Sequence, residues 1–280
     1  MTQLSEIPES FEAFQIGLLG GAVEKRYRRM RPEVQKLPWG TLNLAEHEDK
    51  HIQRARKVWT TAAFQEYRTG VMVTAALTAM MEVGTPLDLI AIATRFPLDE
   101  MVHVELCCRL LAELGGPVRL LHEPEKLTMP VHNPPTPFLR AAELVMRIFC
   151  VGEAASIPIL HSGWKNSKVP LIRAMMGRIV KDEAAHGSFG WLFFDWIQDE
   201  LSPEERVYLR QVARHEIAKL ERMWSRYAGE DVEALDMGTL GWMDPRKYWR
   251  TAHASLQRQV IEPLAARNLD PREVSPILGH

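Results

Sequence analysis

The segment that decides the fold is GGPVRLLHEPEKLTMPVHNPPT, residues 115–136. It opens on two glycines and is broken repeatedly by proline, so no long helix can form within it. Its prolines are Pro117, Pro124, Pro130, Pro134 and Pro135. At roughly 3.3 Å per residue it can extend to about 70 Å. The segment is therefore long enough to cross a whole helical domain.

Helix start signals recur on both sides of this segment. A capping side chain is followed by a proline, whose missing N–H costs nothing in the first turn of a helix, at Thr85-Pro86, Thr136-Pro137, Ser202-Pro203 and Asp244-Pro245. Asn43 with Glu46 and Ser202 with Glu205 have the spacing of a capping box. With the intervening turn residues, these signals predict helices over 43–83, 86–114, 137–163, 169–199, 203–228 and 245–267. No strand-like alternation of useful length appears, so we predict an all-α protein.

The lengths of the connections predict the topology. The first and second helices, and the third and fourth, are joined by short connections and should form two antiparallel hairpins. Residues 115–136 join these hairpins as one long crossover. We therefore expect a four-helix bundle over 43–199 with a C-terminal helical extension over 200–280, all in one domain spanning 1–280.

Composition excludes several classes of protein. The chain is 46% hydrophobic and has 34 Lys plus Arg against 36 Asp plus Glu, so its net charge of −2 offers no attraction to nucleic acid. The basic run from Lys25 to Arg31 is interpreted as a solvated helix face. Cys107, Cys108 and Cys150 show no disulfide or zinc-ribbon spacing. No signal peptide is evident, and the apolar run from Val71 to Met81 is too short to span a membrane. We expect a cytoplasmic protein that binds neither nucleic acid nor membrane.

Two of the predicted helices carry the same motif. Asp99-Glu100-x-x-His103 lies on the second helix, and Asp182-Glu183-x-x-His186 lies on the fourth. A spacing of three puts the carboxylate and the imidazole on one helix face, where both reach the same metal ion. One Glu-x-x-His pair arises easily by chance, as Glu48 with His51 shows. Repetition of the longer motif, once in each hairpin, indicates a metal site.

Depth along the hairpins predicts the partners of these motifs. An antiparallel first helix meets the level of Glu100 about 16 to 19 residues before the turn near Gly84, which is where Glu66 lies. Glu82 lies at the turn itself, and Glu48 and His51 lie about 15 or more residues, roughly 22 Å or more, beyond Glu66. On the third helix, the best match to the second motif is Glu153, whereas Glu143 fits less well.

As a set, these residues resemble the six ligands of the ferritin-like di-iron carboxylate proteins: Glu66, Glu100, His103, Glu153, Glu183 and His186. The resemblance covers about residues 43–199 and implies two bound iron ions, with manganese and iron together as a variant. It also implies that the aspartate before each glutamate holds the metal-bound histidine of the other hairpin, pairing Asp99 with His186 and Asp182 with His103. Two divalent cations would neutralise four buried carboxylates charge for charge, which agrees with the resemblance.

Proline and glycine near the motifs favour a binding pocket. Pro97 and Pro158 should kink their helices beside Glu100 and Glu153. Glycine is costly inside a helix, and Gly70 and Gly187 either leave space beside the metals or allow close helix packing. A pocket one helical turn from the ligands would be lined by Gly70, Cys107, Phe149, Ile157, Ile179 and Gly187.

These features and the resemblance together predict a non-haem di-iron oxygenase. It would use O2 as co-substrate to hydroxylate or N-oxygenate a small organic substrate. Electrons would come from an external donor, because no flavin or nicotinamide fingerprint is present. The alternatives are a ferroxidase or other iron-handling protein, and a non-catalytic helical partner protein. His215 is interpreted as a polar or packing residue, and the C-terminal helices either cap the bundle or form a homodimer contact.

Overall fold

The structure is a computed structural model that describes residues 11–228, 240–241 and 243–274. It is an all-α protein built from long packed helices. The longest are α2 (Asp49–Glu82), α4 (Phe96–Glu113), α7 (Pro170–Ile197) and α8 (Pro203–Ala228). A further continuous helical stretch is made of α5 (Pro137–Val145), the π-helical segment η4 (Met146–Glu153) and α6 (Ala154–Asn166).

Shorter elements complete the described chain. They are α1 (Gly21–Met30), α3 (Leu87–Ala93), α9 (Pro245–Ser255), the π-helical segment η5 (Leu256–Ile261), α10 (Glu262–Ala265) and the 3₁₀ turns η1 (Pro32–Lys36), η2 (Leu44–Glu46), η3 (Pro124–Leu127) and η6 (Pro271–Glu273). Two strands of two residues each, β1 (Glu12–Ala13) and β2 (Leu121–His122), pair antiparallel. These strands are too short to produce an alternation in the sequence.

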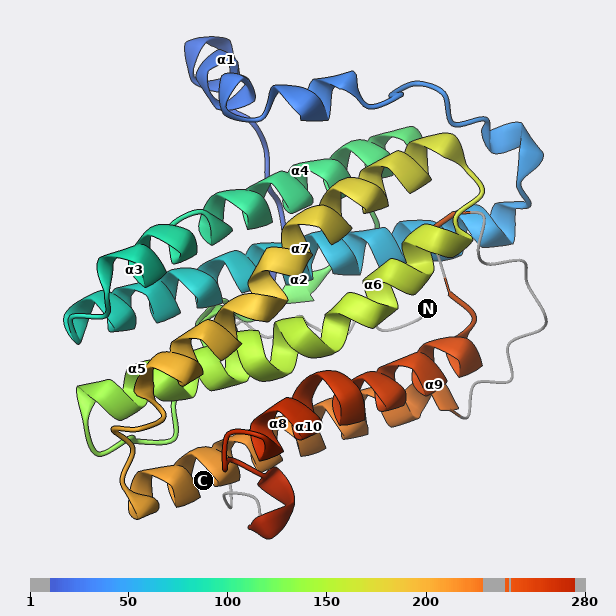
Figure 1. Ribbon diagram of the computed structural model, residues 1–280. Helices are drawn as coiled ribbons and strands as arrows, with labels where there is room; N and C mark the ends of the chain where they lie inside the picture. Colours follow the sequence, from blue (N-terminus) through green and yellow to red (C-terminus); the bar gives the residue numbers. More distant parts are fainter. Residues whose placement is uncertain (1–10, 229–239, 242, 275–280) are drawn as a thin grey trace.

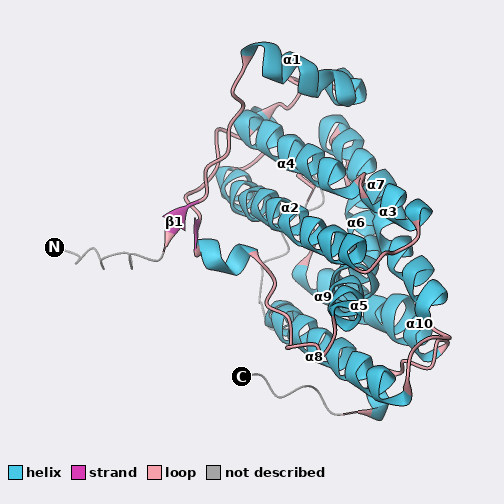
Figure 2. Ribbon diagram, turned by 90° about the vertical axis from the view of Figure 1, so that its left-hand side faces the viewer, coloured by secondary structure: helices cyan, strands magenta, loops and turns pink. Residues whose placement is uncertain are grey.

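The helices pack in layers (Figure 1). Helix α2 lies along α4, and α7 lies along α6 and η4. Helix α5 packs on α2, while α8 and α9 cover the other side of η4 and α6. Helix α1 lies outside this assembly, beyond α4 (Figure 2). The crossover between α4 and α5 runs along α2 through η3 and carries β2.

Several of the predicted helix starts are confirmed by their hydrogen bonds. The Thr136 hydroxyl accepts from the backbone N–H of Leu139, and the Asp244 carboxylate accepts from that of Lys247. Ser202 and Glu205 form the reciprocal capping box, with N···O distances of 2.9 and 3.2 Å. Each pair satisfies backbone donors that the first turn of a helix leaves free.

Two starts differ from the prediction. The Asn43 side chain caps the 3₁₀ turn η2, and α2 begins six residues later, at Asp49. The predicted helix over 86–114 is two helices, because α3 ends at Ala93 and α4 begins at Phe96. Pro97 therefore lies in the first turn of α4, where its missing N–H removes no helical bond, and the expected kink within one helix is replaced by a break.

The stretch Pro137–Asn166 is long and apolar enough to cross a membrane by length and composition alone. Its most apolar window has a mean hydropathy of 1.5, and 61% of that window is buried inside the protein. Its neighbours α7, α8 and α9 cover it, and it contributes much of the largest hydrophobic core. Packing within the protein accounts for this composition.

Candidate metal centre

The six predicted ligands come from four helical segments that meet in the protein interior. Helix α2 carries Glu66, α4 carries Glu100 and His103, the last residue of η4 is Glu153, and α7 carries Glu183 and His186. All are buried except Glu66, whose side chain is 18% exposed. The ligand atoms of Glu66, Glu100, His103 and Glu183 lie within 4.8 Å of one another, as do those of Glu100, Glu153 and His186.

The first of these groups is centred on Nδ1 of His103. This atom lies 3.4 Å from Oε2 of Glu66, 3.2 Å from Oε1 of Glu183 and 3.7 Å from Oε2 of Glu100. The second group is centred on Nδ1 of His186. That atom lies 3.1 Å from Oε1 of Glu100 and 3.3 Å from Oε2 of Glu183.

The two groups share Glu100, and Glu183 of the first group also faces the second histidine, so each of these two carboxylates presents one oxygen to each histidine. Glu66 belongs to the His103 side alone and Glu153 to the His186 side alone. A carboxylate that faces two ligand sets at once is suited to bridge two cations. The side chains are therefore arranged as two adjoining metal sites with two shared carboxylates.

The outer nitrogen of each histidine faces an aspartate of the opposite hairpin. Nε2 of His103 lies 3.3 Å from Oδ2 of Asp182, and Nε2 of His186 lies 3.6 Å from Oδ2 of Asp99. This is the crossed pairing that the resemblance implies. An Nε2–H directed at a carboxylate leaves the Nδ1 lone pair free to bind a metal, which is how second partners orient metal-binding histidines.

Three arginines that were not among the predicted site residues hold these aspartates in place. Arg95 contacts both aspartates, at 2.7 Å to Asp99 and 2.8 Å to Asp182. Arg178 lies 2.5 Å from Asp182, and Arg31 lies 2.5 Å from Asp99. A signal was present for two of them, because each motif continues four residues back to an arginine as Arg-x-x-x-Asp-Glu-x-x-His.

Arg31 follows α1, within the basic run that was predicted to be a solvated helix face. In the structure, Arg28 of the same run pairs with Glu105 at 2.6 Å, so part of that run binds α4. This contact attaches the N-terminal segment to the helix that carries Glu100 and His103 (Figure 2).

The inner polar atoms of the centre are buried and lack hydrogen-bond partners. They include both carboxylate oxygens of Glu100, Oε2 of Glu183 and Nδ1 of both histidines. Buried polar groups in proteins are nearly always satisfied, and each exception calls for an explanation. Inward-facing carboxylate oxygens and imidazole nitrogens are the ligands that first-row divalent metals take. The residues present therefore fit two metal ions.

The electrostatics of the centre lead to the same conclusion. Burial is the main cause that raises the pKa of Glu66, to about 7, and it also raises the pKa of Glu153 well above its ordinary value; neighbouring carboxylates add to both shifts. Burial opposes protonation of His186, but the nearby carboxylates of Asp99, Glu100 and Glu183 raise its pKa to about 12. Without metal, this cluster takes up protons to reduce its negative charge. Divalent cations would replace those protons.

The acidic residues weighed as alternatives to Glu66 and Glu153 lie outside the candidate metal centre. Glu48 is exposed and pairs with Lys50 at 3.1 Å, while Glu82 is exposed and pairs with Arg140 at 3.0 Å. Glu143 is buried away from the centre, where it accepts hydrogen bonds from Arg147, Tyr208 and the backbone of His132. Of the acidic residues weighed for α2, the structure brings Glu66 to the histidines.

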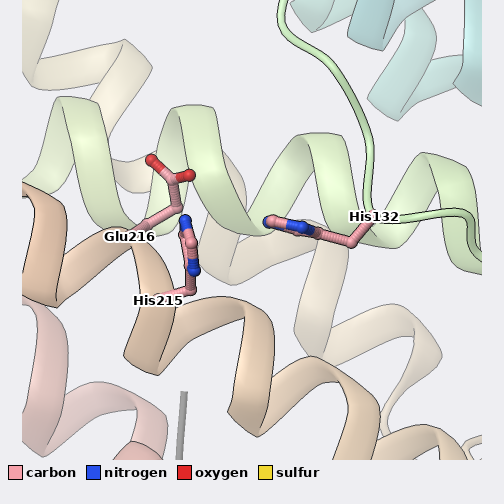
Figure 3. A group of neighbouring side chains, drawn as sticks. All are labelled: His132, His215 and Glu216. Carbon is pink, nitrogen blue, oxygen red and sulfur yellow. The ribbon is translucent and has the colours of Figure 1, made fainter. Parts of the chain in front are cut away.

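A second group of metal-ligating side chains lies between the crossover and α8. Ligand atoms of His132, His215 and Glu216 are within 4.8 Å of one another (Figure 3). Its electrostatics differ from those of the main centre, because Glu216 is already paired with Arg147 at 2.8 Å and with Lys219 at 3.4 Å. A single carboxylate that is neutralised by two cations has no need of a metal. The paired motifs therefore provide the stronger metal site.

The predicted pocket residues pack tightly rather than enclose space. A Cβ added at Gly70 would lie 2.6 Å from Cε of Met101, and one at Gly187 would collide with Ile157. Cys107, Phe149 and Ile179 are buried in the hydrophobic cores. Of the two interpretations of these glycines, close helix packing is the one that the structure supports.

A cavity of about 300 Å³ does reach the centre, from a different side. Its floor includes Glu66, Glu153 and Glu183, and its walls come from α2, η4, α6 and α8. None of the six predicted pocket residues lines it. Sequence spacing indicated the candidate ligands that the structure brings together but not this cavity, because α8 forms one of its walls and lies outside the predicted bundle.

Comparisons with protein-family models, with curated proteins and with solved structures found no match to this chain. The assignment of the centre therefore rests on the geometry, burial and charge of its side chains.

Proposed function

We propose that the protein is a non-haem di-iron oxygenase that uses O2 to oxidise a small organic substrate. The observation that carries the proposal is the pair of histidine-centred ligand groups joined by Glu100 and Glu183, whose carboxylates each face both histidines. Two iron ions held there would supply the electrons and the open coordination positions that bind and reduce O2. Manganese in place of one iron would suit the same ligands.

The arrangement of the helices supports a ferritin-like bundle. The pair α2 and α4 forms one hairpin, α6 and α7 form the other, and the crossover between α4 and α5 joins them. Ferritin-like di-iron proteins place two glutamates and two Glu-x-x-His motifs on four helices that face inward. Here α2 and η4 provide the single glutamates, while α4 and α7 provide the motifs.

The residues of this chain have distinct tasks in such a centre. Asp99 and Asp182 orient the two imidazoles and keep the proton on Nε2. The two aspartates are kept ionised by Arg31, Arg95 and Arg178. The pKa of Asp182, for example, stays below its ordinary value despite burial, because His103 and Arg178 stabilise its negative charge. Phe96 packs its ring 4.4 Å from that of His186 and limits the access of water on that side.

The cavity favours an organic substrate over iron storage. It reaches ligands of both metal sites, and side chains such as Met72, Ile148 and Leu220 give it apolar walls. Glu66 is the ligand most open to solvent, so the substrate and O2 would approach from this side. A site that only oxidises iron has no comparable need for an apolar cavity.

The experiment is an O2-uptake assay on protein loaded anaerobically with two equivalents of Fe(II), with a chemical reductant and a panel of small organic compounds. Product formation that consumes O2 in step with substrate supports the oxygenase. His103→Ala and His186→Ala should abolish it, whereas the exposed control Glu48→Gln should retain it. Rapid oxidation of iron with no organic product from any compound would favour the ferroxidase.

A further inference from the structure

The cavity that reaches the metal centre has a charge pattern of its own. Outside the proposed ligands, its charged lining residues are Arg68, Arg147, Lys219 and Glu216. Positive charge is therefore in excess there. The remaining lining is largely apolar, with four methionine and leucine side chains from α2, the crossover and α8 among them: Met72, Met129, Leu220 and Met223.

Arg147 is already committed to protein partners. It is 4% exposed and contacts Glu143 at 2.9 Å, Glu216 at 2.8 Å and the carbonyl of Pro130. These contacts occupy its guanidinium and also neutralise Glu216. Arg147 therefore supports the wall of the cavity and is not available to bind a ligand.

Arg68 and Lys219 both line the cavity, Arg68 from α2 and Lys219 from α8. The Nε of Arg68 donates to the carbonyl of Lys126 at 3.3 Å, and no carboxylate among the described residues pairs with its guanidinium. The Lys219 side chain is 47% exposed, and its contact with Glu216, at 3.4 Å, is longer than the 2.8 Å contact between Glu216 and Arg147. The cavity is thus lined by one arginine that has no carboxylate partner among the described residues and by one half-exposed lysine whose carboxylate contact is long.

The inner end has the opposite character. Glu153 and Glu183 are buried at the floor, so an anion placed there would meet carboxylates rather than cations. The apolar walls between the floor and the two cations suit a hydrocarbon chain. A volume of about 300 Å³ corresponds to about ten non-hydrogen atoms if each takes the roughly 30 Å³ of a water molecule.

We propose that the cavity binds an apolar carboxylate of about this size, with its carboxylate between Arg68 and Lys219 and its hydrocarbon part toward Glu153 and Glu183. The binding of this carboxylate does not depend on the proposed function. Its oxidation does rest on that function, and the atoms oxidised would be those far from the carboxylate. Anion recognition itself requires Arg68 and Lys219, not metal.

The test uses octanoate, which has ten non-hydrogen atoms, beside 1-octanol and octylammonium. Binding is measured by titration calorimetry on the full chain, both metal-free and loaded with zinc. We expect octanoate to bind at least tenfold more tightly than either analogue, and its affinity to fall as salt is raised. Arg68→Met and Lys219→Met should each weaken octanoate severalfold and leave 1-octanol unchanged, whereas the control Lys57→Met, on α2 away from the cavity, should change neither.

Two outcomes would overturn this inference. One is that 1-octanol or octylammonium binds as tightly as octanoate. The other is octanoate binding that survives both substitutions but requires zinc, which would place the carboxylate on the metals instead. Failure of the proposed function gives a different result, namely intact octanoate binding by a protein that either binds no metal or oxidises iron without forming an organic product. Each melting curve should match that of the parent protein, so that a folding defect is not taken for a binding defect.

Discussion

Replacing Asp182 by asparagine tests how the centre holds its histidines. Asp182 accepts from Nε2 of His103 at 3.3 Å and is contacted by Arg95 at 2.8 Å and Arg178 at 2.5 Å. Asparagine keeps an acceptor of the same shape but removes the negative charge, which leaves two guanidinium groups beside a site that must bind cations. Loss of such a partner lowers metal affinity about 10- to 100-fold, which corresponds to about 1.4–2.7 kcal/mol at 1.36 kcal/mol per decade.

The assay is anaerobic competition for Fe(II) against a chelator, read as the metal content of the protein at each chelator concentration. We expect the loss of Fe(II) affinity in Asp182→Asn to fall in the upper half of that 10- to 100-fold range. Arg95 and Arg178 gain no new carboxylate in the variant, so their positive charge opposes the binding of a cation more strongly. The matched control is Glu105→Gln, on α4, whose side chain is 9% exposed and pairs with Arg28 at 2.6 Å but lies outside both metal groups. Unchanged affinity in Asp182→Asn, or an equal loss in Glu105→Gln, would refute this account of the aspartate.

Three further predictions concern charge, packing and ligand choice. The gain in melting temperature on metal loading, measured by calorimetry, should increase from pH 4.5 to 7. The pKa of Glu66 is near 7 and that of His186 near 12, so the metal-free fold holds protons that the unfolded chain has lost, and the stability of the metal-free protein falls as pH rises. Bound metals displace those protons and remove this loss, so a gain independent of pH would contradict the prediction. Gly190→Ala should destabilise the fold by about 1–3 kcal/mol in urea unfolding, because the new Cβ would lie 3.0 Å from a backbone nitrogen, whereas Gly70→Ala, which meets only the end of a methionine, should cost less; the reverse order would show that the packing is misjudged. Glu66→Ala should lower bound iron well below two per chain by elemental analysis while Glu48→Ala keeps it, and equal retention would exclude Glu66 as a ligand.

Much of the helical architecture could be predicted because its signals are local. Capping at Thr136, Ser202 and Asp244 involves residues three apart, and the structure shows the corresponding hydrogen bonds. The start of α2 and the break before α4 could not be predicted in the same way. At Pro97, one proline is compatible with either a kink or a first turn, and packing of the flanking helices decides between them.

The candidate centre was partly predictable, because helical spacing and depth bring together residues that share a face. Counting from the turns placed Glu66 and Glu153 beside the motifs, where the structure also places them. The role of Gly70 could not be judged from spacing, because the space beside a glycine depends on whether a neighbour such as Met101 fills it. The contact of Arg31 with Asp99 joins residues far apart in the sequence and had no local signal.

The measurement that tests the central claim most directly is an anomalous-scattering map at the iron edge, from crystals of protein produced with ample iron. The account predicts two peaks, one beside Nδ1 of His103 and one beside Nδ1 of His186, with Glu100 and Glu183 between them. A map with no peak near any of these side chains, or with a single peak at His132 and His215 instead, would contradict it.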